Sequence, residues 1–349
     1  MYDTIIIGGG QAGLAMGYYL KKSGGSFLIL DQASSVGESW KKRYNSLKLF
    51  TPRSMSSLPG LPLSGEEDVY PGKDEVASYL EEYAKRFDLP LKLKTTVVKL
   101  EKETGVFKMS TDQGTLLAKQ VVVATGPFQT PALPAEARAG TIHQLHSSSY
   151  RQANQLVPGS VLVVGSGNSG AQIAVELAET RTVYLSVGAK MKFLPQRLAG
   201  KNIFWWFKRL GVLSVTSTFG PGRYLRKQPD PIFGKELQEL IKKERVIVKP
   251  RFKNMEKERV AFVDGTMLEI SNIVWATGFK QNFDWITVAG VLDPEGKPLH
   301  YRGVSPEKGL YFIGLPWQHR RGSALLQGVG EDARYLYEKM TVQQKRRGI

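Results

Sequence analysis

Short apolar runs, each followed by a glycine-rich turn and a helical pattern, recur along this chain. Ile5-Ile6-Ile7 and Val161-Leu162-Val163-Val164 are continuous apolar runs, typical of strands buried on both faces of a parallel sheet. After each run, apolar residues recur with the 3.6-residue period of a helix. Between residues 91 and 123 apolar and polar residues alternate instead, which predicts strands joined by hairpins near Thr104 and Gln113. The pattern therefore predicts an α/β fold with parallel strands.

Both apolar runs lead into the same glycine spacing, GxGxxG. In this motif the first glycine permits a tight turn, the second lets a pyrophosphate approach the backbone, and the third lets helix and strand pack closely. The N-terminus of the helix then faces the phosphates. A second strand ends at Asp31 in the first unit and at Ser186 in the second. This order of elements predicts two dinucleotide-binding units.

The residues at the end of the second strand indicate which cofactor each unit binds. Asp31 can accept hydrogen bonds from a ribose hydroxyl, which favours FAD in the first unit. The second unit has no acid there, and Ser186 and Lys190 can receive a 2′-phosphate, which favours NADPH and leaves NADH open. Lysines that only coat the surface are the alternative interpretation. The residues predicted from the motifs are Gly8, Gly10, Gln11, Ala12, Gly13, Asp31, Gln32, Ala124, Thr125 and Gly126 for FAD, and Gly165, Ser166, Gly167, Asn168, Ser169, Gly170, Ser186, Lys190, Thr277 and Gly278 for NADPH.

The order of the units predicts that the second dinucleotide-binding domain is inserted in the first. We expect a discontinuous FAD-binding domain at 1–151 and 272–349, and an NAD(P)H-binding domain at 152–271. Residues 190–230 fit neither unit, because aromatic residues are interleaved there with Lys and Arg. This segment is either an insertion packed over the cofactor cleft or a surface that touches a membrane or a hydrophobic substrate.

The amino-acid composition excludes several kinds of catalytic centre and indicates the charge of the partners. The 349 residues include no cysteine and four histidines, which excludes a redox dithiol and a cysteine-ligated cluster and argues against a histidine-rich metal centre, so we expect no metal site. The net charge is +16, and residues 180–229 hold ten Lys and Arg without a single acid. Such an excess favours anionic partners such as phosphate-bearing cofactors. No nucleic-acid motif accompanies the charge, so we expect no nucleic-acid binding.

The N-terminus and the hydropathy suggest a location in the cell. The chain leads straight from Met1 into a strand rather than a signal peptide, and no run of 18 apolar residues occurs. We therefore expect a cytoplasmic protein without a transmembrane segment. Peripheral membrane contact and a homodimer are left open.

Several further motifs resemble those of the short bacterial flavin-containing monooxygenase-like proteins, a branch of the class B flavoprotein monooxygenases. The motifs are Gly37-Glu38-Ser39-Trp40, residues 46–52, Tyr70-Pro71, His146-Ser147 and residues 275–279, besides the two glycine motifs. The resemblance implies two Rossmann-like domains of the three-layer ββα FAD/NAD(P)-binding type. It also implies that Glu38, Ser39 and Trp40 contact FAD, that the backbone of Val97 lies at the adenine, and that Gln327 lies near the flavin ring.

The same resemblance implies an activity. In that family NADPH reduces the flavin, O2 adds to give a C4a-hydroperoxyflavin, and a small soft nucleophile or a ketone takes one oxygen atom. The candidate catalytic residues are Thr51, Pro52, His146 and Gln327. Where the family has Asn after the threonine this chain has Pro52, and the family signature F-x-G-x-x-x-H keeps only its histidine, with Gly140 and Ile142 at the other two positions.

These departures keep other functions open. One is an NAD(P)H:acceptor flavin oxidoreductase that passes electrons to a quinone, a ferredoxin or O2, and another is a nucleotide-bound accessory protein of a membrane transporter. His146 is either a structural link between the domains or a residue of oxygenation.

Overall fold

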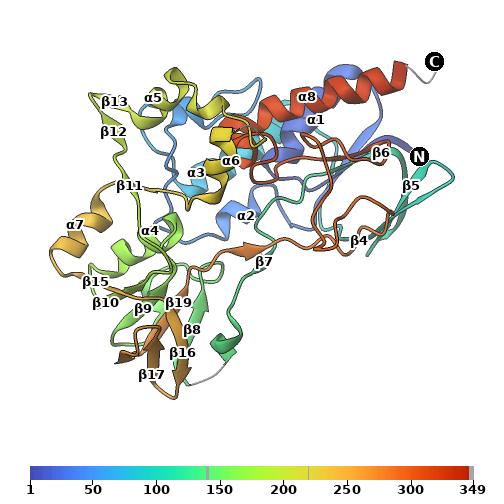
Figure 1. The fold of residues 1–349 in the computed structure, drawn as a ribbon. Coiled ribbons are helices and arrows are strands. Elements are labelled where there is room, and N and C mark those ends of the chain that lie inside the picture. Colours follow the sequence, from blue (N-terminus) through green and yellow to red (C-terminus); the bar gives the residue numbers. More distant parts are fainter. Residues whose placement is uncertain (139–140, 219, 346–349) are drawn as a thin grey trace.

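The computed structural model describes residues 1–138, 141–218 and 220–345, and Gly140 of the altered signature lies outside them. Two separate sheets organise the chain (Figure 1). One lies at the right of the view with both chain ends, and the other at the lower left.

The first sheet has seven strands in the order β3-β2-β1-β6-β5-β4, with β21 also paired to β6. Its strands are β1 (Tyr2–Ile7), β2 (Phe27–Leu30), β3 (Leu91–Lys92), β4 (Val97–Glu103), β5 (Val106–Thr111), β6 (Gly114–Val123) and β21 (Leu310–Phe312). The first part of β6 pairs antiparallel with β5, and its end pairs parallel with β1 and β21. The two predicted hairpins are therefore confirmed as β4–β5 and β5–β6.

The second sheet has five parallel strands in the order β15-β10-β9-β19-β8. They are β8 (His143–His146), β9 (Val161–Val164), β10 (Val183–Ser186), β15 (Val246–Lys249) and β19 (Asn272–Trp275), and beside them lies an antiparallel sheet of β16 (Phe252–Glu256), β17 (Arg259–Phe262) and β18 (Met267–Glu269). Because β8 and β19 pair within this sheet, its strands extend beyond the interval 152–271 at both ends. The domain division itself stays a prediction.

Helices cover the sheets, and two of them begin at the glycine turns. The helices are α1 (Gln11–Ser23), α2 (Glu38–Lys41), α3 (Lys73–Arg86), α4 (Asn168–Leu177), α5 (Ile203–Arg209), α6 (Gly220–Lys227), α7 (Glu236–Lys242) and α8 (Leu326–Lys345). Helices α1 and α8 run side by side (Figure 1). A 3-10 turn at Arg321–Ala324 precedes α8.

Side chains of each central strand alternate between two apolar cores. Ile6 packs in the core with α1, α3 and α8, whereas Ile5 and Ile7 pack on the opposite face. In β9, Val163 and Leu162 divide between two cores in the same way. Strands buried on both faces explain why the sequence shows continuous apolar runs there. The prediction of an α/β fold with two Rossmann-like units is confirmed.

Two crossover segments connect the sheets. They pair antiparallel as β7 (Thr130–Pro131) and β20 (Phe279–Lys280). Each follows an Ala-Thr-Gly turn, at 124–126 and 276–278 respectively. The crossover strands therefore place the two turns next to the junction of the sheets.

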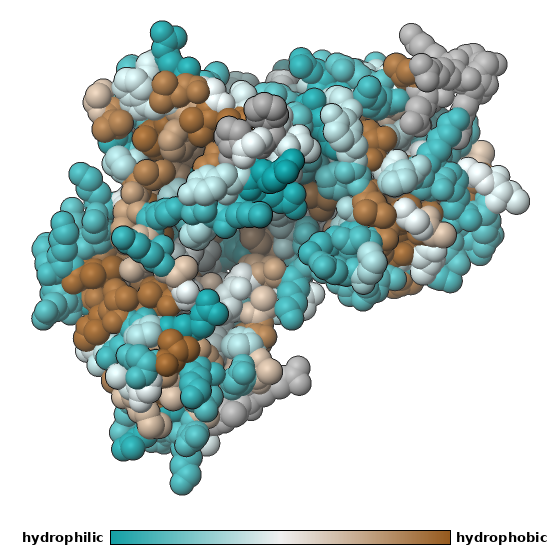
Figure 2. Space-filling model, viewed as in Figure 1, coloured by the Kyte–Doolittle hydropathy of each residue, from teal (hydrophilic) through white to brown (hydrophobic). Residues whose placement is uncertain are grey.

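The insertion 190–230 packs partly onto the first unit. It contains β11 (Phe193–Leu194), β12 (Arg197–Leu198), β13 (Lys201–Asn202), α5 and α6, and β11 pairs with β14 (Ile232–Phe233). Phe204 of α5 stacks on Phe50 with ring centroids 5.8 Å apart, and Met55 packs against the same cluster. Trp205 and Leu210 stay exposed, and Figure 2 shows apolar side chains gathered over this part of the molecule, at the upper left.

Candidate functional site

The first glycine turn brings the end of β1 against the end of β6. Gly8 has a φ of +110°, and a Cβ there would lie 2.4 Å from the carbonyl oxygen of Ala124. A Cβ on Gly13 would lie 1.9 Å from the carbonyl oxygen of Gly8. Only glycine fits both positions, because the strand, the turn and α1 approach within backbone contact.

The second glycine turn repeats this geometry. Gly165 has a φ of +112°, with a hypothetical Cβ 2.4 Å from the carbonyl oxygen of Ala276. A Cβ on Gly170 would lie 1.9 Å from the carbonyl oxygen of Gly165. The two turns thus pack in the same way on Ala124 and Ala276, the first residues of the two Ala-Thr-Gly turns.

The middle glycine of each motif faces open space. A Cβ on Gly10 or on Gly167 would meet no protein atom within 4 Å, so packing does not explain why glycine occupies them. Both are the N-cap residues of their helices, and neither helix has a side-chain cap. The free N–H groups of α1 and α4 together with this open approach fit the pyrophosphate of a dinucleotide.

Asp31 directly follows β2 and lies beside the first turn. Its Oδ2 accepts a hydrogen bond from the N–H of Gly9 at 2.5 Å, and its Oδ1 accepts one from the N–H of Ala33 at 2.7 Å. The backbone N–H of Thr95, just before β4, donates to the Asp31 carbonyl at 2.9 Å. The carboxylate is therefore fixed next to the glycine turn, with Val97 two residues beyond the Thr95 contact.

The short helix α2 follows the first unit. Glu38 accepts hydrogen bonds from the N–H and the hydroxyl of Ser34 and forms an ion pair with Lys42. Lys42 and Ser34 lower the pKa of the Glu38 carboxyl to about 2. Trp40 packs against the α1 core, whereas Gln32 and Ser39 are exposed. Glu38 thus anchors this loop while its neighbours remain accessible.

Thr51 and Pro52 lie in one loop, and Gln327 lies in a different segment. The Thr51 hydroxyl lies 2.8 Å from that of Ser56, which also donates to the carbonyl of Pro52 at 2.9 Å. Pro52 is buried and has no N–H. Gln327, in the first turn of α8, has a buried Oε1 without a hydrogen-bond partner among the described residues. Such an orphaned acceptor fits a missing polar ligand.

α8 also lies close to the first turn. The Nε2 of Gln11, the first residue of α1, donates to the carbonyl of Ala324 at 2.7 Å. This bond joins the start of α1 to the segment that leads into α8. The starts of α1 and α8, and with them Ala12 and Gln327, therefore share one end of the first sheet.

His146 lies at the end of β8 and is 7% exposed. The backbone N–H of Ser148 donates to Nδ1 at 3.1 Å, so the ring proton resides on Nε2 and is donated to the carbonyl of Gly278 at 3.0 Å. Phe279 packs edge-to-face against the ring at 5.1 Å. Both nitrogens are therefore used by the protein, which favours the structural alternative for His146.

Acidification is expected to destabilise the protein through its histidines. Burial lowers the pKa of His146, and burial lowers the pKa of His300 and His319 in the same direction. The unfolded chain then binds protons more readily, so the free energy of unfolding should fall from about pH 7 to about pH 5. Urea unfolding at several pH values tests this, and His146→Gln should reduce the slope. An identical slope in that variant would contradict it.

At the end of β10 the side chains differ from the motif-based expectation. Ser186 is 2% exposed, donates to the carbonyl of Pro250 and accepts from the N–H of Phe252, both at 2.8 Å. Binding of a phosphate by Ser186 would break these bonds. Lys190 is exposed, and Arg251 donates to the Gly188 carbonyl at 3.0 Å. Arg251 was not predicted, because it follows β15 and lies some 60 residues after Lys190 in the chain.

Other motif residues of the second unit hold neighbouring segments. The side chain of Asn168 donates to the carbonyl of Pro231 and accepts from the N–H of Phe233. Thr277 donates its hydroxyl to the carbonyl of Ala132. Ser166 is half-buried and Ser169 is exposed. In the first unit, Thr125 and Gly126 both accept from the side chain of Gln129, with φ +69° at Gly126.

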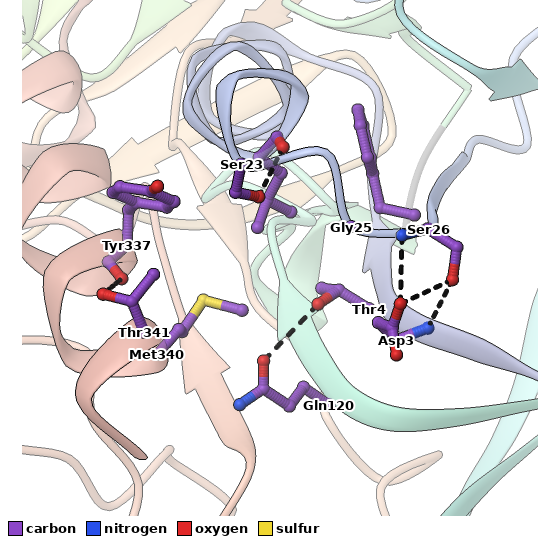
Figure 3. A pocket seen from close by; sticks show the side chains of 11 residues that line it. Asp3, Thr4, Ser23, Gly25, Ser26, Gln120, Tyr337, Met340 and Thr341 are labelled. Carbon is purple, nitrogen blue, oxygen red and sulfur yellow. Dashed lines mark hydrogen bonds between the residues drawn. The ribbon is translucent and has the colours of Figure 1, made fainter. Parts of the chain in front are cut away.

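A small cavity lies at the opposite end of β1, away from the glycine turns. Its lining includes Thr4, Gln120 and Tyr337, and a hydrogen bond of 3.5 Å joins Thr4 to Gln120 (Figure 3). Its volume of about 60 Å³ leaves no room for a nucleotide. The glycine end of the sheet is therefore the candidate site. Among residues 1–138, 141–218 and 220–345, no group of acidic or histidine side chains could hold a metal ion. In the same residues no helix is both long and apolar enough to cross a bilayer.

Two glycine turns, each at the end of a parallel strand in its own sheet, in a chain without a dithiol, define a class: oxidoreductases that bind two dinucleotides. The chain belongs to the pyridine nucleotide-disulphide oxidoreductase family, whose pattern matches residues 5–192, and within it to the flavin-containing monooxygenase-like proteins. The predicted family and the prediction of an oxidoreductase are thereby confirmed.

Similarity extends over the whole chain. It is 54% identical to the uncharacterized oxidoreductase CzcO-like of Geobacillus kaustophilus, covering 96% of this chain and 97% of the relative. It is 30% identical to the probable indole-3-pyruvate monooxygenase YUCCA4 of Arabidopsis thaliana, covering 97% and 90%. The structure of a flavin-containing monooxygenase from Stenotrophomonas maltophilia superposes with a TM-score of 0.82 at 26% identity, covering 98% of both chains.

Proposed function

We propose that this protein is an FAD-dependent, NADPH-consuming monooxygenase that acts on a small soft nucleophile or a ketone. FAD is assigned to the first glycine turn and NADPH to the second. When bound, the flavin supplies hydride acceptance from the nicotinamide and electron transfer to O2. The named functions of the similar monooxygenases support the reaction type.

The observation that carries the proposal is the pair of equivalent open glycine turns in a chain without cysteine. Gly10 and Gly167 leave the same space beside two uncapped helix N-termini. Family members with a redox dithiol pass electrons to a disulphide, and this sequence has no cysteine to do so. Electrons must therefore leave toward O2 or an external acceptor.

The residues around the turns would bind and orient the cofactors. Asp31, held by two backbone N–H groups, is placed to accept from a ribose hydroxyl. The unpartnered Gln327 Oε1 would accept a hydrogen bond from the flavin ring. The Nε2–H of His146 stays on the Gly278 carbonyl and holds the second Ala-Thr-Gly turn in place.

The insertion supports a water-poor site. Phe50, which immediately precedes Thr51, stacks against Phe233 at 5.0 Å and against Phe204 of α5. This aromatic cover over the Thr51 loop favours the packed-insertion interpretation. Exclusion of water strengthens each polar interaction in the site that it encloses.

Stopped-flow absorbance tests the proposal. The protein is reduced anaerobically with NADPH and mixed with oxygenated buffer, and 18O2 labelling then follows transfer to a panel of sulfides, amines and ketones. Return of the oxidised flavin spectrum that lags behind oxygen consumption, with labelled product, supports monooxygenation. Immediate reoxidation with stoichiometric hydrogen peroxide and no labelled product contradicts it.

Pro52 favours the second candidate, an NAD(P)H:acceptor oxidoreductase. Pro52 offers neither a side-chain donor nor an N–H, and the Thr51 hydroxyl is already close to Ser56. Fewer donors at the reacting oxygen weaken its stabilisation. Rapid reoxidation by a quinone or a ferredoxin, without an oxygenated product, would identify this function.

A preference for NADPH over NADH is expected to depend on the two cations near the end of β10, Lys190 and Arg251. Replacing Lys190 and Arg251 together by Gln is expected to raise the KM for NADPH about tenfold, because two cations at a 2′-phosphate are lost. The KM for NADH should stay unchanged. Steady-state kinetics with both cofactors checks this, with the exposed Lys253→Gln as the matched control. An equal rise for both cofactors would argue against a 2′-phosphate site here.

Peripheral membrane contact remains a separate proposal for the outer face of α5. Exposed Trp205 and Leu210 flank the exposed cations Lys208 and Arg209, a combination that favours an anionic bilayer surface. Co-sedimentation with phosphatidylglycerol vesicles should fall when both apolar residues are replaced by Ala. Binding that does not change in that variant removes this proposal.

A further inference from the structure

Arg43 is a cation without an acid, placed where the two units meet. Its guanidinium lies 4.4 Å from the ring centre of Phe128 and 4.9 Å from that of Phe279. In the described part of the chain its side chain has neither a hydrogen bond nor an ion pair. Burial lowers the pKa of Arg43, and the nearby Arg151 lowers it further. An unpaired, half-buried cation is costly unless a ligand supplies the missing charge.

The two rings come from the two crossover segments. Phe128 follows the Ala-Thr-Gly turn on which Gly8 packs, and Phe279 follows the turn on which Gly165 packs. The rings themselves meet edge-to-face at 5.3 Å. Cation–π contacts hold a guanidinium by its face, so its N–H edge remains free to donate.

The next residue points to one of the two nucleotides. The Tyr44 hydroxyl donates to Oε1 of Gln172 in α4 at 3.1 Å. Tyr44 is buried in the core of the second unit, and Phe279 packs against His146 of the same unit. Arg43 is therefore held next to α4 and the second Ala-Thr-Gly turn rather than next to Asp31.

From this placement we propose that Arg43 binds the pyrophosphate of the dinucleotide seated on the second glycine turn. The planar N–H fork matches two phosphate oxygens, and the uncapped N-terminus of α4 faces the same anion. The proposal rests on the proposed use of a nicotinamide dinucleotide. It adds a residue of the first unit to the site of the second, which couples nucleotide binding to the junction of the sheets.

Equilibrium binding to the FAD-loaded protein tests this. Arg43→Met should raise the Kd of NADP+ and of NAD+ by the same factor, about tenfold or more, because both carry the pyrophosphate. Arg43→Lys, which keeps the charge without the fork, should lie between. Adenosine 2′-monophosphate, which lacks the pyrophosphate, should bind wild type and variant equally. Arg259→Met, an exposed arginine on β17, is the matched control and should change nothing.

Four outcomes distinguish this proposal from the function on which it rests. Unchanged dinucleotide Kd values in a folded, FAD-containing Arg43→Met variant overturn it, and a raised KM for an anionic substrate alone would assign Arg43 to the substrate instead. A parallel loss of FAD and of melting temperature, without selective loss of dinucleotides, indicates a structural role and also overturns it. A wild-type protein that binds neither NADP+ nor NAD+ defeats the proposed function itself.

Discussion

Gly167→Ala is expected to give a folded protein that keeps its flavin but is poorly reduced by NADPH. A Cβ at this position meets no protein atom within 4 Å, and its φ of −76° is one that alanine adopts freely. The added methyl group fills the space through which a pyrophosphate approaches the backbone. An overpacking cost of about 1–3 kcal/mol corresponds to a Kd for NADPH raised roughly 5- to 150-fold.

Gly10→Ala should show the reverse selectivity. Its Cβ also meets no protein atom, so the variant should fold but lose flavin. Flavin absorbance per protein and anaerobic titration with NADPH measure the two effects. Wild-type reduction of Gly167→Ala, or a full flavin content in Gly10→Ala, would contradict the assignment of the two turns.

The outer glycines supply the matched control. An alanine at Gly13 or Gly170 would place its Cβ 1.9 Å from a carbonyl oxygen of the turn. These variants should lose stability whether or not a cofactor is present, because strand and helix would have to separate. The middle-glycine variants should each lose one cofactor and stay folded, whereas the Gly13 and Gly170 variants should lose the fold. This difference would show that the middle glycines serve ligand binding and the outer glycines serve packing.

Local sequence was sufficient to predict the two turns and the hairpins. Five or six consecutive residues determine each GxGxxG turn, so Gly8 and Gly165 adopt nearly the same φ although they are far apart in the chain. The alternation of apolar residues before Val123 likewise predicts that neighbouring strands pair as hairpins, as β4–β5 and β5–β6 do. In these segments a decisive contact lies within the segment itself, such as the close approach of Gly13 to the Gly8 carbonyl.

Contacts between segments were harder to predict. The β8 strand lies outside the predicted second unit, because a short apolar run does not encode which sheet it joins. Ser186 shares a face of its sheet with Tyr184, and β16 covers that face, so its hydroxyl points into the core and not to a ligand. The alternation along β10 predicts which face of the sheet Ser186 occupies. It does not predict that β16 covers that face.

The cations at the site show the same limit. Arg43 and Arg251 are ordinary basic residues in sequence, in a chain with a net charge of +16. Their significance appears only when the aromatic rings of Phe128 and Phe279, or the carbonyl of Gly188, lie beside them. A glycine motif therefore predicts the backbone of a nucleotide site. It does not predict the side chains from distant segments that complete the site.

An ion pair between the buried Asp332 of α8 and Arg302, which precedes β21, is expected to contribute strongly to stability. Asp332 is fully buried, neither of its oxygens has a hydrogen-bond partner in the described residues, and Nε of Arg302 lies 3.5 Å from Oδ1. The guanidinium also covers the ring of Tyr335 at 4.1 Å. Arg302→Met leaves a buried carboxylate without a counter-charge, which should lower the free energy of unfolding by about 3 kcal/mol.

The exposed pair on the same helix is the matched control. Arg334 and Glu338 lie 3.9 Å apart with both side chains more than 60% exposed, so Arg334→Met should cost no more than about 0.5 kcal/mol. Urea unfolding at saturating FAD compares the two variants. Equal losses in both would show that Asp332 does not depend on Arg302.

A second replacement tests whether the loss of stability comes from the unpaired carboxylate of Asp332. In Arg302→Met the additional change Asp332→Leu should recover much of the lost stability, because an apolar pair no longer buries a charge. Since Asp332 and Gln327 belong to the same helix, the single variant should also weaken flavin retention, and the double variant should restore it. Recovery of stability without recovery of flavin would mean that the pair, rather than the helix it stabilises, acts directly on the cofactor site.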